Sequence, residues 1–249
     1  MRVQFFPTCL VELLRPDVGT SALRLLRDAG HDPEVPAGAT CCGQPAYNAG
    51  YATEARRVAR RTLRALGDDD RACVVASGSC ATMMSHHWPE LFEGTPDEPE
   101  ARRAASRAVE LTAFLTSAGG DDSTGERADT GQNGDRWPAD AVVVHDSCHA
   151  LRELGAGTTV RRALGDAGHA MVDAHGAERC CGFGGSFSVK LPAVSVAMAD
   201  EKLDNFVATG SEQVTSCDLS CLLHLEGRAA RRGLALRFDH VATLLDRGT

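Results

Sequence analysis

Ten cysteines are the residues of this 249-residue chain with the clearest capacity for chemistry. The first ten residues, MRVQFFPTCL, lack the apolar stretch of a secretory signal, so we expect a cytoplasmic protein. The cytosol keeps thiols reduced. Ten reduced thiols in a chain of this size indicate metal or redox chemistry more than disulfide cross-links.

Eight of these cysteines repeat in two sets. In each half a first cysteine lies 32 positions before a Cys-Cys-Gly triplet, and a Ser-Cys pair follows 38 or 40 positions after the triplet's second cysteine. Residues 20–31 (TSALRLLRDAGH) and 158–169 (TTVRRALGDAGH) repeat with them and agree at seven of twelve positions. The chain therefore reads as a duplicated unit. The two sets are Cys9, Cys41, Cys42 and Cys80, and Cys148, Cys180, Cys181 and Cys221.

The elements that must position these sulfurs alternate between strand and helix. Apolar runs at 3–6, 72–76 and 141–144 predict strands, as does the segment 213–216, and each ends shortly before a cysteine. Helical spacing of apolar residues predicts helices between them, as in 22–29, 160–167 and 191–207, and Ala104, Ala108, Leu111 and Leu115 predict a further helix. This alternation is typical of an α/β fold with mostly parallel sheets. Ligands of such sheets bind beyond the carboxyl ends of the strands, so we expect four sulfurs to gather there in each half.

The duplication predicts the domain organisation. We expect two α/β half-domains, 1–118 and 139–249, with a Gly/Asp-rich flexible linker over 119–138. Residues 119–136 contain no aliphatic residue larger than alanine and cannot bury enough apolar surface to order themselves.

Four clustered thiolates favour zinc or an iron–sulfur cluster. Structural zinc usually takes its ligands from Cys-x2–4-Cys pairs, whereas this chain has long spacings and adjacent cysteines. A glycine after each adjacent pair permits unusual backbone angles and a close approach to a cluster. Backbone N–H groups of residues 183–186 could donate to cluster sulfurs. A structural zinc protein and a thiol–disulfide switch remain as alternatives, although disulfides between adjacent cysteines are strained.

The repeated ladder resembles the CCG cysteine-rich domain, which occurs twice in one of the heterodisulfide reductase subunits and in the iron–sulfur subunit of glycolate oxidase. A closer resemblance is to the lactate utilization protein A family, and it covers the chain outside the linker. The motifs that carry it are FFPTC at 5–9, CCGQPAYNAGY at 41–51, SGSC at 77–80, CGFGGSFSVK at 181–190 and DLSCLL at 218–223.

This resemblance implies an iron–sulfur electron-transfer subunit of a multi-subunit system that oxidises L-lactate to pyruvate. The chain would be a non-flavin part of an oxidoreductase complex of the L-lactate dehydrogenase type. It implies one [4Fe-4S]-type cluster in each half, held by the two sets of four cysteines. The implied partners are companion iron–sulfur and other lactate-oxidation subunits, with membrane association only through a partner. The alternative is a subunit of a glycolate oxidase or a heterodisulfide reductase-like complex.

The chain departs from the heterodisulfide reductase pattern, in which the distal ligands form a Cys-x-x-Cys pair. Ser77 and Asp218 stand where that pattern has its additional cysteine. Cys217 is a candidate fifth ligand of the second half, but we expect it to be a small buried residue at a strand end. Cys73 lies within a predicted strand and is expected to belong to the core.

Other polar residues are weaker candidates. His31 and His169 end the repeated segments, where we expect them to close helix-to-strand turns. His149 follows Cys148 and either tunes the second cluster or is an ordinary histidine, and Lys190 either faces an anionic group or is solvated. His86 and His87 have no partner at ligand spacing and are expected at the surface.

Composition excludes several functions. The net charge is 26 − 34 = −8, which argues against nucleic acid as a partner. No apolar run approaches the roughly 18 to 20 residues that span a bilayer, so we expect no direct membrane insertion. The glycines after Cys181 do not form a dinucleotide-binding fingerprint.

Overall fold

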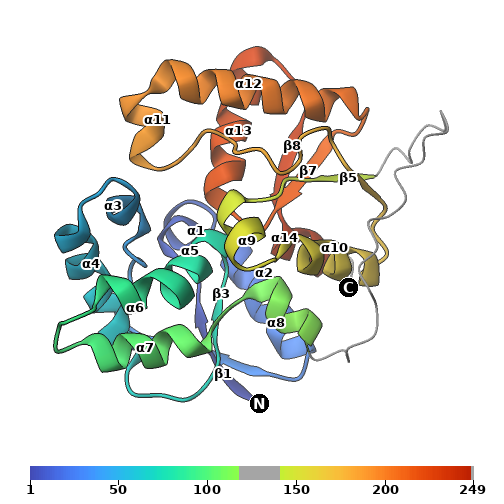
Figure 1. Ribbon diagram of the computed structural model, residues 1–249. Helices are drawn as coiled ribbons and strands as arrows, with labels where there is room; N and C mark the ends of the chain where they lie inside the picture. The colour runs from blue at the N-terminus through green and yellow to red at the C-terminus, as the bar shows by residue number, and fades with distance from the viewer. Residues whose placement is uncertain (118–140, 248–249) are drawn as a thin grey trace.

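Two four-stranded parallel sheets form the framework of the protein (Figure 1). The structure is a computed structural model that describes residues 1–117 and 141–247, and the predicted linker at 119–138 lies outside the described residues. The sheet orders are β2-β1-β3-β4 and β6-β5-β7-β8, so the second half repeats the topology of the first. The predicted duplicated α/β fold is therefore confirmed.

The first half runs from β1 to α8. Its strands are β1 (Arg2–Phe6), β2 (Asp32–Glu34), β3 (Cys73–Val75) and β4 (Ala108–Glu110). Its helices are α1 (Cys9–Leu14), α2 (Pro16–Asp28), α3 (Gln44–Asn48), α4 (Ala52–Leu66), α5 (Gly78–Thr82), the π-helical turn η1 (Met83–His87), α6 (Trp88–Leu91), α7 (Glu98–Arg107) and α8 (Leu111–Ser117).

The second half runs from β5 to α14. Its strands are β5 (Val142–Val144), β6 (Met171–Val172), β7 (Gln213–Ser216) and β8 (Arg237–His240). Its helices are α9 (Cys148–Glu153), α10 (Gly157–Asp166), α11 (Ser186–Lys190), α12 (Pro192–Ala208), α13 (Leu219–Arg232) and α14 (Val241–Arg247).

One predicted element is wrong. The helix expected through Ala104, Ala108, Leu111 and Leu115 is interrupted by β4, which separates α7 from α8. Ala108 pairs with Cys73 and Glu110 pairs with Val75 at the edge of the first sheet. The spacing of apolar residues in the sequence remains helical across these three residues, so it does not predict a strand. Pairing with β3 holds them in an extended conformation.

A central core joins the two sheets, and a second core lies on the outer face of each. Val3 and Phe5 of β1 contribute to the same central cluster as Val142 and Val144 of β5. Phe6 and Val143, one position out of step, contribute to the outer cores. This is the alternation of side chains expected along a strand.

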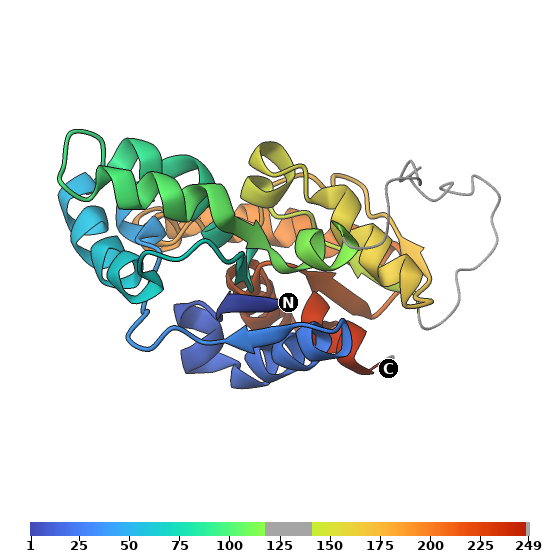
Figure 2. The same ribbon diagram turned by 90° about the horizontal axis from the view of Figure 1, so that it is seen from below.

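Helices of the two halves pack against each other in a repeated way (Figure 2). Helix α2 packs on α14 and α10 packs on α8, while α5 packs on α9 and α1 on α13. By their place in the two halves, α2 corresponds to α10, α8 to α14, α1 to α9 and α5 to α13. Each contact therefore occurs twice with the two halves exchanged, and the halves are related by an approximate twofold axis. The two halves therefore share one interior.

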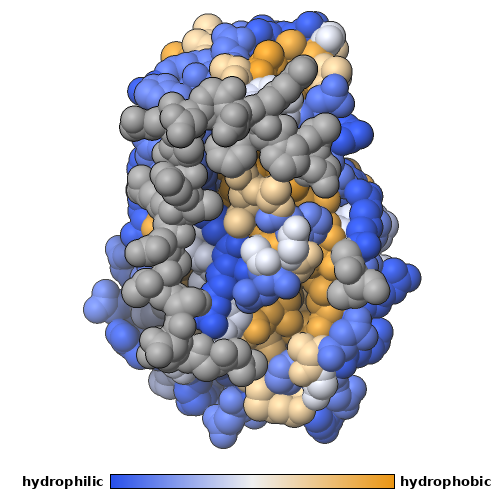
Figure 3. Space-filling view, turned by 90° about the vertical axis from the view of Figure 1, so that its right-hand side faces the viewer, coloured by the Kyte–Doolittle hydropathy of each residue, from blue (hydrophilic) through white to orange (hydrophobic). Residues whose placement is uncertain are grey.

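The surface adds two observations. Figure 3 shows a face on which hydrophobic residues form a band through the middle of the molecule, between hydrophilic ones. Partly buried hydrophobic residues, among them Leu23, Val109 and Leu115, extend the central core outward. Across the described ranges, none of the helices combines the length and the apolar character that a membrane span requires.

Candidate metal centre

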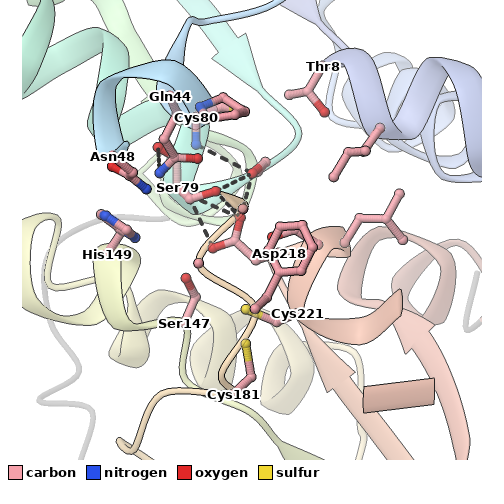
Figure 4. A pocket seen from close by; sticks show the side chains of 18 of the residues that line it. Thr8, Gln44, Asn48, Ser79, Cys80, Ser147, His149, Cys181, Asp218 and Cys221 are labelled. Atoms are coloured by element: carbon pink, nitrogen blue, oxygen red, sulfur yellow. Dashed lines mark hydrogen bonds between the residues drawn. The ribbon is translucent and has the colours of Figure 1, made fainter. Parts of the chain in front are cut away.

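A single cavity of about 400 Å³ lies between the halves, beyond the carboxyl ends of strands from both sheets (Figure 4). Polar residues from both halves line it, including Gln44, Ser79, Ser147 and Asp218. All eight cysteines of the two predicted sets line the same cavity: Cys9, Cys41, Cys42, Cys80, Cys148, Cys180, Cys181 and Cys221.

The first set comes from three separate segments. Cys9 begins α1 directly after β1, Cys41 and Cys42 lie in the loop before α3, and Cys80 lies on α5. The Sγ atoms of Cys9 and Cys41 are 3.8 Å apart, and those of Cys42 and Cys80 are 3.2 Å apart. The set therefore forms a compact group of sulfurs at the end of the first sheet.

Gly43 allows the Cys41–Cys42 loop to take its shape. Its φ is 91°, a left-handed conformation, and a Cβ atom there would lie 2.7 Å from the carbonyl oxygen of Ala55. The Gly43 N–H donates to the Sγ of Cys41 over 3.5 Å. Only glycine fits this turn without displacing α4.

The second set repeats this arrangement. Cys148 begins α9 after β5, Cys180 and Cys181 precede α11, and Cys221 lies on α13. Gly182 has φ 89°, its N–H donates to the Sγ of Cys180 over 3.4 Å, and a Cβ there would lie 2.6 Å from the carbonyl oxygen of Ser195. The same local device therefore shapes both cysteine loops.

One thiol in each set is acidic. Hydrogen bonds from Cys42 and Cys9 lower the pKa of Cys41 to about 3, and those from Cys148 and Cys181 lower the pKa of Cys180 to about 2. The hydrogen bond to the acidic neighbour raises the pKa of Cys9 and of Cys148. A cysteine must lose its proton to bind a metal, and the lowered pKa values make Cys41 and Cys180 the cysteines of their sets that lose it most readily.

The donor set of each half fits a soft metal centre. Four thiols converge in each half, which suits an iron–sulfur cluster or zinc, and the Asp218 carboxylate that also lines the cavity is hydrogen-bonded to Ser77 and Ser79. In a zinc site the four sulfurs close around one ion at about 2.3 Å. A shared cavity of about 400 Å³ leaves room for groups larger than single ions.

A polar network that the sequence analysis missed joins the halves beside the cysteines. The Asp218 carboxylate accepts hydrogen bonds from the Ser77 hydroxyl at 2.5 Å and the Ser79 hydroxyl at 2.7 Å. The Ser79 backbone N–H donates to both carboxylate oxygens at 3.1 Å. Ser77 and Asp218 are the two positions that depart from the Cys-x-x-Cys pattern, and they are hydrogen-bonded to each other.

His145 was also missed. It follows β5, its ring is buried, and neither ring nitrogen has a hydrogen-bond partner among the residues that the structure describes. One ring nitrogen and the Sγ atoms of Cys181 and Cys221 all lie within 4.8 Å of one another. Burial, and then the charge of Lys202, lower the pKa of His145 to about 3, so the ring is neutral. Its position, three residues before Cys148, was the available signal.

Lys202 is the third residue that sequence reasoning overlooked. It lies on α12 and is 2% exposed. Its ammonium donates to the carbonyl oxygens of Gly176, Ala177 and Arg179 at 2.9, 2.6 and 2.8 Å. These bonds hold the turn that leads into Cys180. Burial lowers the pKa of Lys202 to about 8.

The two remaining cysteines do not line the cavity. Cys217 is 2% exposed, contributes to the central core, and its Sγ lies 3.0 Å from where a Cβ on Gly78 would be. Cys73 lies in the outer core of the first half, where burial raises its pKa to about 12.

The predicted histidines take different places. His31 and His169 each donate a backbone N–H to a helix carbonyl at 2.9 Å, in equivalent helix-to-strand turns. His149 lines the cavity, with its Nδ1 3.8 Å from the Sγ of Cys148. His86 is exposed, as expected, but His87 is half-buried. The Nε2 of His87 lies 3.0 Å from the Glu153 carboxylate, across the junction of the halves.

Lys190 also joins the two halves. It is exposed, and its ammonium lies 5.3 Å from the ring centroid of Tyr51. This is a cation–π contact at the surface, between α11 and the segment that follows α3.

Comparison with known proteins agrees with the duplication. The family described as "CCG: Cysteine-rich domain" matches residues 3–85 and 142–226. The chain is 38% identical over 249 residues to lactate utilization protein A of Exiguobacterium sp. strain AT1b, covering 99% of this chain and 97% of that protein. It is 38% identical over 248 residues to the protein of the same name from Geobacillus kaustophilus, with 99% of both chains covered. It is 35% identical over 253 residues to lactate utilization protein A 2 of Bacillus cereus strain Q1, covering 100% of this chain and 99% of that one.

Proposed function

Because the chain belongs to the lactate utilization protein A family, we propose that it is the iron–sulfur electron-transfer subunit of a multi-subunit system that oxidises L-lactate to pyruvate. The observation that carries this proposal is that two equivalent sets of four cysteines line one cavity. Thiolates in sets of four are the ligands of most protein iron–sulfur clusters.

Each half would hold one cluster of the [4Fe-4S] type. Cys9, Cys41, Cys42 and Cys80 would hold the first, and Cys148, Cys180, Cys181 and Cys221 the second. When bound, such clusters supply one-electron chemistry. The chain fixes the sulfurs on rigid helix starts and glycine turns. Leu10, Phe183 and Leu219 provide apolar lining that limits access of water to the cavity.

The remaining steps belong to partners. We assign removal of hydride from lactate to a companion subunit, and the electrons pass onward through other iron–sulfur or carrier subunits. We place the protein in the cytoplasm, with any contact to a membrane made through such a partner. A complex that acts on glycolate or on a disulfide would need the same iron–sulfur subunit. Only its partner subunits would distinguish it from a complex that oxidises lactate.

The test is the metal content of protein purified without oxygen. We expect about eight irons and about eight acid-labile sulfides per chain if both sets are loaded, or about four of each for one set. A signal in electron paramagnetic resonance (EPR) should appear on reduction. Stoichiometric zinc without sulfide would overturn the proposal and favour a structural zinc protein.

Single substitutions assign the clusters to their sets. Cys42→Ser and Cys181→Ser should each remove the iron and sulfide of one half. Cys73→Ala is the matched control, because it removes a buried thiol that does not line the cavity. Full iron in both serine variants would refute the ligand assignment.

A further inference from the structure

The two halves can be compared position by position behind their cysteine loops. Gly43 packs against the carbonyl of Ala55 on α4, and Gly182 packs in the same way against Ser195 on α12. Two turns further along these helices lie Thr62 and Lys202, each seven residues beyond the contact. Thr62 and Lys202 therefore occupy equivalent places.

Both residues support a cysteine loop through hydrogen bonds, but only Lys202 carries a charge. The Thr62 hydroxyl accepts from the N–H of Thr40 and of Cys41 at 3.0 and 3.1 Å and donates to the Cys41 carbonyl at 2.9 Å. It is neutral. The ammonium of Lys202 donates to three carbonyls, one of them that of Arg179 directly before Cys180, so its positive charge lies beside the second cysteine loop.

The choice of lysine is unusual for this chain. Its 26 basic residues include only two lysines, Lys190 and Lys202, and the rest are arginine. Burying an ammonium costs several kcal/mol unless hydrogen bonds satisfy it. The compact ammonium can reach three convergent carbonyls, which the broad guanidinium plane would not fit.

A second difference lies on the other side of the cysteines. His145 precedes Cys148 by three residues and Phe6 precedes Cys9 by three, and both side chains are buried on the outer faces of their sheets. Phe6 offers no hydrogen bond. The His145 ring has an N–H to donate, neither ring nitrogen is hydrogen-bonded within the described residues, and one of them lies within 4.8 Å of the sulfurs of Cys181 and Cys221.

Neighbouring acidic groups do not cancel the positive charge that Lys202 adds beside the second cysteine set. Asp146 is bound by the Arg161 guanidinium through two hydrogen bonds at 2.7 and 3.0 Å. Asp218 acts on Cys148, but it is hydrogen-bonded to Ser77 and Ser79 beside Cys80, so its charge is shared by both sets.

We propose that the two centres are inequivalent, and that Lys202 and His145 give the centre of Cys148, Cys180, Cys181 and Cys221 the higher reduction potential. This inference rests on the proposed function. Reduction adds negative charge to a cluster, and a nearby cation or an N–H bonded to sulfur stabilises the reduced form. A singly reduced protein would therefore carry its electron in the second half.

Proteins with one centre each provide the comparison. Cys42→Ser should retain only the second centre and Cys181→Ser only the first. Each is titrated with dithionite in the presence of redox mediators while its EPR signal is followed. We expect the Cys42→Ser protein to be reduced at the higher potential.

Two further variants in the Cys42→Ser background test the residues. Lys202→Gln removes the charge but keeps an amide donor for the carbonyls, and His145→Phe copies Phe6 of the first half. Each should lower the ratio of reduced to oxidised centre at least about tenfold at a fixed potential, which is 59 mV for one electron. Lys190→Gln is the matched control: it removes the other lysine at an exposed position and should change the ratio less than about twofold.

The outcomes separate the two claims. If iron and sulfide are present but the Cys42→Ser centre titrates at or below the Cys181→Ser centre, the inference fails and the proposed function stands. Unchanged potentials in both Lys202→Gln and His145→Phe would also overturn it, and would leave Lys202 as a support of the loop alone. Wild-type protein without iron and sulfide would remove both claims.

Discussion

Gly78 lies at a tight contact between the two halves. A Cβ atom at this position would be 2.5 Å from the Cβ of Ala150 and 3.0 Å from the Sγ of Cys217. The Gly78 N–H also donates to the Cys217 carbonyl at 3.4 Å. Cys217 thus belongs to the contact between the halves, one residue from the Asp218 that binds Ser77.

We predict that Cys217→Ala keeps the iron of both halves, because its sulfur packs in the core and does not line the cavity. Cys221→Ala should lose the iron and sulfide of the second half. Metal analysis of the two variants, purified side by side, checks this. Loss of iron from Cys217→Ala would make Cys217 a fifth ligand.

A second prediction concerns Gly78 itself. Gly78→Ala should destabilise the protein by about 1–3 kcal/mol, because the added methyl group overpacks the junction. Gly227→Ala is the control: Gly227 lies within α13, a Cβ added there would meet no atom within 4 Å, and alanine should stabilise by about 0.5–1 kcal/mol. Urea unfolding of both variants measures the difference. Equal stability of Gly78→Ala and wild type would show that the junction can adjust.

At the scale of residues, the sequence predicted those parts of the site that repeat at regular spacing along the chain. The two cysteine sets could be found because each set spans fewer than 80 residues and the intervals of the first set recur in the second. His145, Lys202 and the Ser77–Asp218 pair could not, because each acquires its meaning from a partner in another segment. Ser77 and Asp218 are 141 positions apart.

At the scale of elements, the edge strands β4 and β8 end in equivalent residues of different chemistry. Glu110 pairs with Val75, and His240 pairs with Ser216. The Glu110 carboxylate accepts from the N–H groups of Thr112 and Ala113 at the start of α8. The His240 Nδ1 accepts from the Ala242 N–H at the start of α14. Both residues cap the helix that follows.

Glu110 predicts a pH dependence of stability. Burial raises its pKa from 4.5 to about 7. Between these values the folded state keeps a proton that the unfolded state releases, so the stabilising contribution of Glu110 is complete below pH 4.5 and is lost as the pH rises through 7. Wild type should lose up to about 3 kcal/mol relative to Glu110→Gln across this interval.

Urea unfolding of both proteins at several pH values measures this loss. Burial lowers the pKa of His240 to about 4, which has the opposite effect on the pH dependence, but His240 is present in both proteins and cancels in the difference. A constant difference between the two proteins from pH 4.5 to 7 would show that Glu110 does not retain its proton.

Elements were predictable where the apolar period was long or the strand was central. The four central strands and the helix α12 were recognised from such runs. The edge strands were not, because they owe their extended conformation to pairing with a neighbouring strand. β2 even contains Pro33, which an edge strand tolerates.

At the scale of the whole molecule, the two halves share the central core, so we expect them to fold as one unit. Val3, Phe5, Val142 and Val144 pack in one cluster, and each half alone would expose its share of that surface. Contiguous exposed apolar surface of this kind leads to association or unfolding.

We therefore predict that residues 1–118 and 139–249, produced separately, do not unfold cooperatively, whereas co-expression of the two pieces restores a single transition. Circular dichroism during heating measures both. A sharp transition in either isolated piece would show that one half is stable without the other.

The hydrogen bond between Ser77 and Asp218 also bears on the ancestry of the chain. Residues at equivalent positions can touch each other only on the axis that relates the two halves. In a dimer of two identical half-length chains, such an axial position would face its own copy, as serine against serine or aspartate against aspartate. Two buried carboxylates at that distance would repel each other unless they shared a proton. A serine opposite an aspartate requires two copies that mutate separately, as the two halves of this single chain can.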